Sequence, residues 1–163
     1  MQFNVGIDSE KINRQLILSL KNTANPSLGP SGIYKTYIRI MVPSDSQVVS
    51  VKSVSGQTQK TLTPEIIQEN GRQEIGVYIE ITPQASTDVV FEWQSSLGQS
   101  GGLTNYGLYI RKQAGVNDDP ISIKFSAPGP ISSVPNFTLT GGGLYTYNTT
   151  LDQDFFARFS WKK

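Results

Sequence analysis

Two tyrosine–arginine pairs are the side chains of this sequence best suited to binding chemistry. The pattern Tyr-x-x-Tyr-Ile-Arg occurs twice, and its second tyrosine and its arginine are the candidate ligand-binding residues: Tyr37, Arg39, Tyr109 and Arg111. Phenol rings and guanidinium planes both stack on flat ligand surfaces, and both donate hydrogen bonds. If the two copies lie side by side, they form a platform suited to a sugar or an acidic polymer. The alternative is a solvated sheet face on which these side chains pair across strands.

Loop carboxylates are a second set of candidates. Asp118 and Asp119 lie together before a proline, and clustered oxygens are the ligands that hard cations such as Ca²⁺ prefer. Their spacing does not match a calcium-binding loop, and Asp before proline is also an ordinary turn former. A hydrolase that uses Asp118, Asp119 or Asp154 is a further alternative, because paired carboxylates cleave glycosides when they converge across a cleft. We expect no metal site and no catalytic residue.

The residue types that are missing exclude much familiar chemistry. The chain has no histidine and no cysteine, which removes the usual neutral-pH general base, thiol nucleophiles, Ser-His-Asp triads and common zinc ligands. The 14 basic and 13 acidic residues give a net charge of +1, and the basic residues are scattered rather than gathered into a stripe that binds phosphates. We therefore expect a non-catalytic protein that has no cofactor and does not bind nucleic acid.

The two tryptophans offer flat rings for stacking on a sugar. Trp93 alternates in phase with Val89 and Phe91, so we expect it to pack in the core. Trp161 lies beside the terminal lysines and outside any clear pattern. We expect its ring to be exposed or to lie in an interface.

Strands must position these side chains, because apolar and polar residues alternate and no segment has a convincing helical period. The clearest strand is residues 33–43, in which Ile38 and Ile40 lie on one face and Tyr37 and Arg39 on the other. The second copy of the pattern divides between faces in the same way. We expect the first tyrosine of each copy, Tyr34 or Tyr106, to lie on the core face.

Turn residues divide the chain into about eight to ten short strands. We expect residues 33–42 to form a hairpin with 47–54, and residues 75–82 to pair with 87–95. Residues 63–69 could be a single helical turn or part of a long loop. The regular spacing of strands predicts an all-β fold, an antiparallel Ig-like β-sandwich that forms a single domain over residues 1–163.

Several segments carry a resemblance to a known family. They are IYKTYIRIMVP at residues 33–43, QVVSVKSV, YGLYIRKQAGVNDDPISIKF and the closing TLDQDFFARF. Together they resemble the C-terminal β-rich region of large, membrane-anchored, extracytoplasmic bacterial proteins of a domain-of-unknown-function family. The resemblance implies a cell-envelope location and an anchor outside this sequence, and it implies no catalytic residues.

The strand pattern, the missing catalytic residues and the resemblance lead to one functional expectation. We expect a non-catalytic structural or protein-interaction module of a bacterial cell-surface protein, excised from a larger chain. The alternative is a glycan-binding module that uses an exposed Tyr/Arg sheet face. The expected partner is a protein or a cell-envelope glycan, and a membrane is involved only through an anchor outside the sequence.

Overall fold

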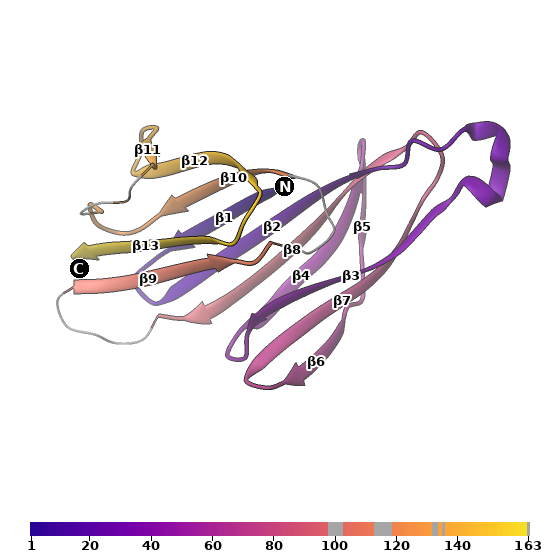
Figure 1. Cartoon of the computed structure of the whole chain (residues 1–163). Coiled ribbons are helices and arrows are strands. Elements are labelled where there is room, and N and C mark those ends of the chain that lie inside the picture. The colour runs from indigo at the N-terminus through magenta and orange to yellow at the C-terminus, as the bar shows by residue number, and fades with distance from the viewer. Residues whose placement is uncertain (98–102, 113–118, 132–133, 135, 163) are drawn as a thin grey trace. The chain divides into compact units, whose positions relative to one another are not determined.

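The computed structural model describes residues 1–97, 103–112, 119–131, 134 and 136–162 (Figure 1). In these residues the chain forms 13 strands and one short 3-10 helix, Pro26–Gly32. The prediction of an all-β fold is confirmed. The strands outnumber the eight to ten that the sequence predicted, because three strands were not anticipated, one at Gln2–Ile7 and two within residues 56–72. Within the described part of the chain, no helix is long and apolar enough to cross a membrane.

The chain divides into two compact units, which are described separately. The first comprises Met1–Gln15 with Ser96–Lys163, and the second comprises Leu16–Ser95. Strand β2 (Lys11–Lys21) runs from the first unit into the second, with the bounds that the sequence predicted. The assignment of residues 1–163 to a single domain stays a prediction.

The first unit contains two groups of paired strands. Its other strands are β1 (Gln2–Ile7), β9 (Leu103–Ile110), β10 (Asp119–Ser126), β11 (Thr138–Leu139), β12 (Leu144–Leu151) and β13 (Phe155–Lys162). One sheet has the order β11-β12-β10-β1, with β2 beyond β1, and a separate pair joins β13 to β9. Strands β1 and β10 are parallel, with Phe3 opposite Ile123, so the first sheet is mixed rather than purely antiparallel.

Aromatic rings form the core of the first unit. The rings of Phe125 and Phe159 stack with their centroids 3.7 Å apart, and Tyr106 packs against both. Trp161 is 0% exposed, so the expectation of an exposed ring was wrong. The reason is that strand β13 continues to Lys162, which places Trp161 in phase with the buried Ala157 and Phe159.

The second unit contains two further sets of strands. They are β3 (Tyr34–Pro43), β4 (Gln47–Ser55), β5 (Thr58–Thr61), β6 (Glu65–Glu69), β7 (Arg72–Ile81) and β8 (Ser86–Ser96). One set has the order β2-β8-β4-β5, and the other is a three-stranded sheet with the order β3-β7-β6. In Figure 1 the strands β3, β7 and β6 lie side by side.

Both predicted hairpins of the second unit were wrong. Strand β3 pairs with β7, and β4 pairs with β8, so each of the two predicted turns joins strands of different sheets. The turn after β3 is as tight as expected, because the Ser46 backbone N–H donates to the Pro43 carbonyl at 3.0 Å. All four strands alternate apolar and polar residues, and this alternation fixes the faces of a strand without fixing its neighbour. Trp93 is buried, as predicted.

Candidate functional site

Strand β3 positions the first tyrosine–arginine pair on the outer face of the β3-β7-β6 sheet. Ile38 and Ile40 are half-buried on the inner face, and Tyr37 and Arg39 are exposed. The register places Tyr37 opposite Tyr78 of β7 and Lys35 opposite Glu80. We call this surface the tyrosine face, and define it by these residues of β3, β7 and β6: Lys35, Tyr37, Arg39, Glu65, Gly76, Tyr78 and Glu80.

A glycine lets Tyr37 reach across the sheet. A Cβ atom on Gly76 would lie only 2.3 Å from the Tyr37 hydroxyl oxygen, so the outer end of the tyrosine ring lies against the bare backbone of β7. From there the Tyr37 hydroxyl donates a hydrogen bond to the Glu65 carboxylate on β6. Gly76 is opposite both Arg39 and Glu65 in register. One side chain therefore spans all three strands.

Two charged groups act on the Tyr37 ring. The Arg39 guanidinium carbon lies 5.1 Å from the ring centroid, within the range of a cation–π interaction. The hydrogen bond to the Glu65 carboxylate is the main cause of a raised pKa for the Tyr37 hydroxyl, and the Arg39 charge opposes this shift. The phenol thus stays protonated, which preserves the hydrogen bond.

Tyr78 is held in a similar way by its own strand. Its hydroxyl donates to the Glu80 carboxylate at 2.9 Å, and the Lys35 ammonium lies 3.4 Å from the same oxygen. The hydrogen bond from Tyr78 and then the contact with Lys35 lower the pKa of Glu80, and the same hydrogen bond raises the pKa of Tyr78. Both exposed tyrosines of this face are therefore held by hydrogen bonds to carboxylates.

The first unit contains a smaller surface built on the second copy of the pattern. We call it the β9-β13 patch, and define it by these residues: Tyr109, Arg111, Asp154 and Phe156. The Tyr109 hydroxyl and the Lys112 backbone N–H both donate to Asp154. The hydrogen bond from Tyr109 is the main cause of the lowered pKa of Asp154, and it also raises the pKa of Tyr109. Phe156 is opposite Tyr109 in register, and both rings are exposed.

Each predicted tyrosine–arginine pair is brought together in the structure. The two pairs do not lie on neighbouring strands, so they do not form the single platform that the sequence suggested. Tyr37 and Arg39 are in contact on β3, and Arg111 acts on the Tyr109 hydroxyl at the end of β9. Strand β3 pairs with β7 whereas β9 pairs with β13, and the two strands belong to different units. Each pair therefore has its own surroundings.

Sequence reasoning missed the partners of the first pair. Tyr78 could have been found, because it alternates with the buried Val77 and Ile79 and so had to lie on the outer face. Glu65 could not, because the sequence predicted a helical turn or a loop for residues 63–69. Both alternatives were wrong, since residues 65–69 form strand β6. Nothing in the sequence signalled that Gly76 leaves the space occupied by the Tyr37 ring.

The acidic candidates are placed only in part. Asp118 lies outside the described residues. Asp119 is exposed at the start of β10, opposite Leu151, and Asp154 is taken up by hydrogen bonds within the β9-β13 patch. Among the residues that the structure describes, no group of three or more acidic residues is arranged to hold a metal ion.

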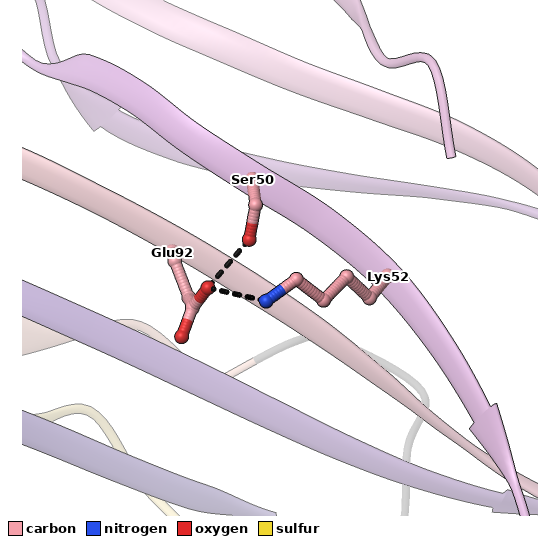
Figure 2. Close-up of polar contacts among 3 residues, drawn as sticks. All are labelled: Ser50, Lys52 and Glu92. Atoms are coloured by element: carbon pink, nitrogen blue, oxygen red, sulfur yellow. Dashed lines mark hydrogen bonds and ion pairs between the residues drawn. The ribbon is translucent and has the colours of Figure 1, made fainter. Parts of the chain in front are cut away.

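A polar cluster joins β4 to β8 in the second unit. Figure 2 shows Ser50 and Lys52 of β4 reaching the same oxygen of Glu92, with the Lys52 ammonium at 3.1 Å. The register shifts between Val48 and Ser50, so Val49 forms a bulge that is exposed. After the bulge, Ser50 and Lys52 lie on the same face of β4 and share the Glu92 carboxylate. This contact favours the observed pairing of β4 with β8 over a pairing shifted by one residue. We assign the cluster a structural role.

Comparison with known proteins yields a likeness of fold. Neither a protein-family model nor a curated protein sequence matches the chain. Native leukotriene A4 hydrolase from Saccharomyces cerevisiae is similar in structure, with a TM-score of 0.55 and 10% sequence identity over 99% of this chain and 28% of the hydrolase chain. The same yeast enzyme in complex with bestatin gives a TM-score of 0.55 and 10% identity over 98% and 27% of the two chains. The chain thus spans little more than a quarter of either hydrolase chain.

Proposed function

We propose that this chain is a non-catalytic protein-interaction module of a bacterial cell-surface protein, and that the tyrosine face is its contact surface. The observation that carries the proposal is that two exposed tyrosines, Tyr37 at 41% and Tyr78 at 52% exposure, are both held by carboxylates. Tyrosine offers a large contact area with few rotatable bonds. Because these rings are already fixed, a partner that binds them loses little side-chain entropy.

The direction of the pKa shifts supports a non-catalytic role. The pKa values of Glu80 and Asp154 are lowered, and those of Tyr37, Tyr78 and Tyr109 are raised. General acid–base catalysis near neutral pH needs the opposite displacements, which bring the pKa of an acid or base toward the working pH. These groups are instead fixed in one protonation state, as suits a recognition surface.

The cell-surface location and the anchor outside this sequence rest on the resemblance to extracytoplasmic bacterial proteins. The likeness to leukotriene A4 hydrolase concerns the fold alone at 10% identity. It is therefore no argument that this chain has a hydrolase activity or a hydrolase substrate.

Site-specific photocrosslinking tests the contact surface. Benzoylphenylalanine in place of Tyr78 should yield a discrete adduct with a different protein in cells that produce the chain, and Tyr37→Ala should reduce this adduct. The same photoreactive group in place of Lys60, which is exposed on β5, should yield none. Equal adducts from both positions, or none from position 78, would contradict the proposal.

A cell-envelope glycan is the second candidate partner, and one observation favours it. The Tyr37 ring is held against Gly76 with a guanidinium 5.1 Å from its centroid, so an exposed ring and charged hydrogen-bonding groups lie together. Sugars are bound by such a combination of aromatic and polar groups. Binding on a glycan array should be lost in Tyr37→Ala and unchanged in the Lys60→Ala control. An array without any bound glycan would reject this candidate.

A further inference from the structure

The β3-β7-β6 sheet has two open edges. Among the described residues, β3 and β6 each pair only with the central strand β7. In a strand that is paired on one side, alternate backbone N–H and C=O groups point away from the sheet and are free to pair with another strand. Both edges could therefore accept an additional strand.

Strand β6 is an edge strand that exposes apolar side chains. All five of its residues are exposed, with Ile66 at 47% and Ile67 at 38%. Ile66 is opposite Ile75, which is fully buried, so the apolar inner face of the sheet continues onto β6 and is uncovered there. The other short edge strand of this unit, β5, is also fully exposed but contains only Thr, Gln and Lys. Exposed isoleucines thus distinguish β6 from an ordinary solvated edge.

The outer faces of the two edges are complementary in charge and spacing. Glu65, Ile67 and Glu69 follow one another at alternate positions of β6, which gives the order acidic, apolar, acidic. At alternate positions β3 carries the matching order basic, aromatic, basic, formed by these residues: Lys35, Tyr37 and Arg39. Strands β3 and β6 both run antiparallel to β7 and are therefore parallel to each other. A second copy added in the same orientation thus pairs its β3 in parallel with β6, which can set Glu65 beside Lys35 and Glu69 beside Arg39 on one face.

We propose that β6 of one copy of this chain pairs with β3 of a second copy, so that the three-stranded sheet continues from molecule to molecule. The added strand covers Ile66 and places opposite charges side by side. The two edges differ, so the contact is heterologous, and copies add in a row rather than closing as a symmetric pair. The inference concerns the edges of the sheet, and it requires neither the partner protein nor the glycan proposed above.

The same pairing of β3 with acidic residues already occurs within one chain. Lys35 lies opposite Glu80 of β7 and contacts it at 3.4 Å, and the Tyr37 hydroxyl donates to Glu65. The side chains of β3 thus already contact carboxylates of β7 and β6 in the same chain. The proposal places the glutamates of β6 from a second copy along the unpaired edge of β3.

Sedimentation of the whole chain at rising concentration tests the inference. The average mass should increase beyond that of a dimer, and added salt should reduce it because salt screens the exposed charges. Glu69→Lys should weaken the association about tenfold or more, since like charges then face each other. The matched control Lys60→Glu, a charge reversal on β5, should leave association unchanged. A chain that stays monomeric at every concentration, or a closed dimer, would overturn the proposal.

Mixing charge-reversed variants makes the test specific to the two edges. Glu69→Lys alone, Arg39→Glu alone and Lys35→Glu alone should each associate poorly, while circular dichroism shows that each is folded. An equal mixture of Glu69→Lys with Arg39→Glu should again grow beyond a dimer, because the two reversed charges face each other in the parallel pairing. A mixture of Glu69→Lys with Lys35→Glu should not grow beyond a dimer. A first mixture that does not grow beyond a dimer, or equal growth in both mixtures, would contradict the pairing of β6 with β3.

Discussion

The tyrosine face and the β9-β13 patch are built on the same six-residue pattern but differ in what holds the tyrosine. Tyr109 takes its carboxylate from Asp154, immediately before the strand that pairs with β9. Tyr37 takes its carboxylate from Glu65, two strands away, and reaches it across Gly76. The pattern thus sets the face of the strand on which the ring lies, and the surrounding strands decide how the ring is fixed.

The first tyrosine of each copy shows the same contrast. Tyr106 is 9% exposed, packs among core rings and accepts a hydrogen bond from the Arg14 side chain at 3.2 Å. Tyr34 begins β3 and remains 46% exposed. The expectation of a core position is confirmed for Tyr106, whereas Tyr34 is not buried. The end of an edge strand has too few neighbours to cover a ring.

The largest expected difference between the two copies is in their first tyrosines. Tyr106→Ala should lower the free energy of unfolding by about 3–5 kcal/mol, because it removes a buried ring that packs on Phe125 and Phe159. Tyr34→Ala should cost about 1 kcal/mol or less, as surface substitutions usually do. Denaturant unfolding measures both values. Similar losses would show that the two positions are equivalent after all.

The glycines should come next. Gly76→Ala should cost about 1–3 kcal/mol, because its Cβ would collide with the Tyr37 ring and force the ring aside. In the β9-β13 patch a Cβ on Gly107 meets only a Phe156 ring carbon at 4.0 Å, so Gly107→Ala should be neutral or stabilising by about 0.5–1 kcal/mol.

Thermal or denaturant unfolding of the two glycine variants gives the comparison. The double variant Gly76→Ala/Tyr37→Ala should recover part of the loss, since the colliding ring is absent. A Gly76→Ala variant as stable as the parent protein would contradict the close approach of the Tyr37 ring.

The smallest expected effects concern pH. Tyr37 and Tyr109 have raised pKa values because they donate to carboxylates, so their stabilising contribution is present at neutral pH and is lost as the pH rises through the raised values. The lowered pKa of Asp154 has the opposite consequence. Its contribution is present above the ordinary pKa of aspartate and is lost as the pH falls through the lowered value.

Tyrosinate absorbance during an alkaline titration measures the first of these shifts. Glu65→Gln should bring one tyrosine back toward its ordinary pKa, and Asp154→Asn should do so for another. Each variant should leave the tyrosine of the other surface unchanged. If either variant shifted both tyrosines, the two surfaces would not be independent.

Local alternation of side chains made much of the fold predictable. The bounds of β2, the outward position of Tyr37 and Arg39, and the burial of Trp93 all follow from the period of two along a strand. Trp161 obeys the same rule, and its position at the end of the chain concealed this. Alternation therefore predicts the face of a residue even near a terminus.

The pairing of strands could not be predicted in this way. Strands β3 and β4 are joined by a tight turn and yet lie in different sheets, because their neighbours are chosen by packing over the whole unit. The residues that fix Tyr37 come from β6 and β7, which lie far from β3 in the sequence. The pair of candidate residues was readable from the sequence, whereas the face that holds them depends on contacts between distant segments.

The mobility of the Tyr37 ring is the most direct test of the central claim that this tyrosine is fixed in advance of binding. Carbon relaxation of tyrosine rings by NMR reports motion on the picosecond-to-nanosecond scale. The ring of Tyr37 should be nearly as restricted as that of the buried Tyr106, and Glu65→Ala should release it. A Tyr37 ring that moves as freely in the parent protein as in Glu65→Ala would contradict the claim.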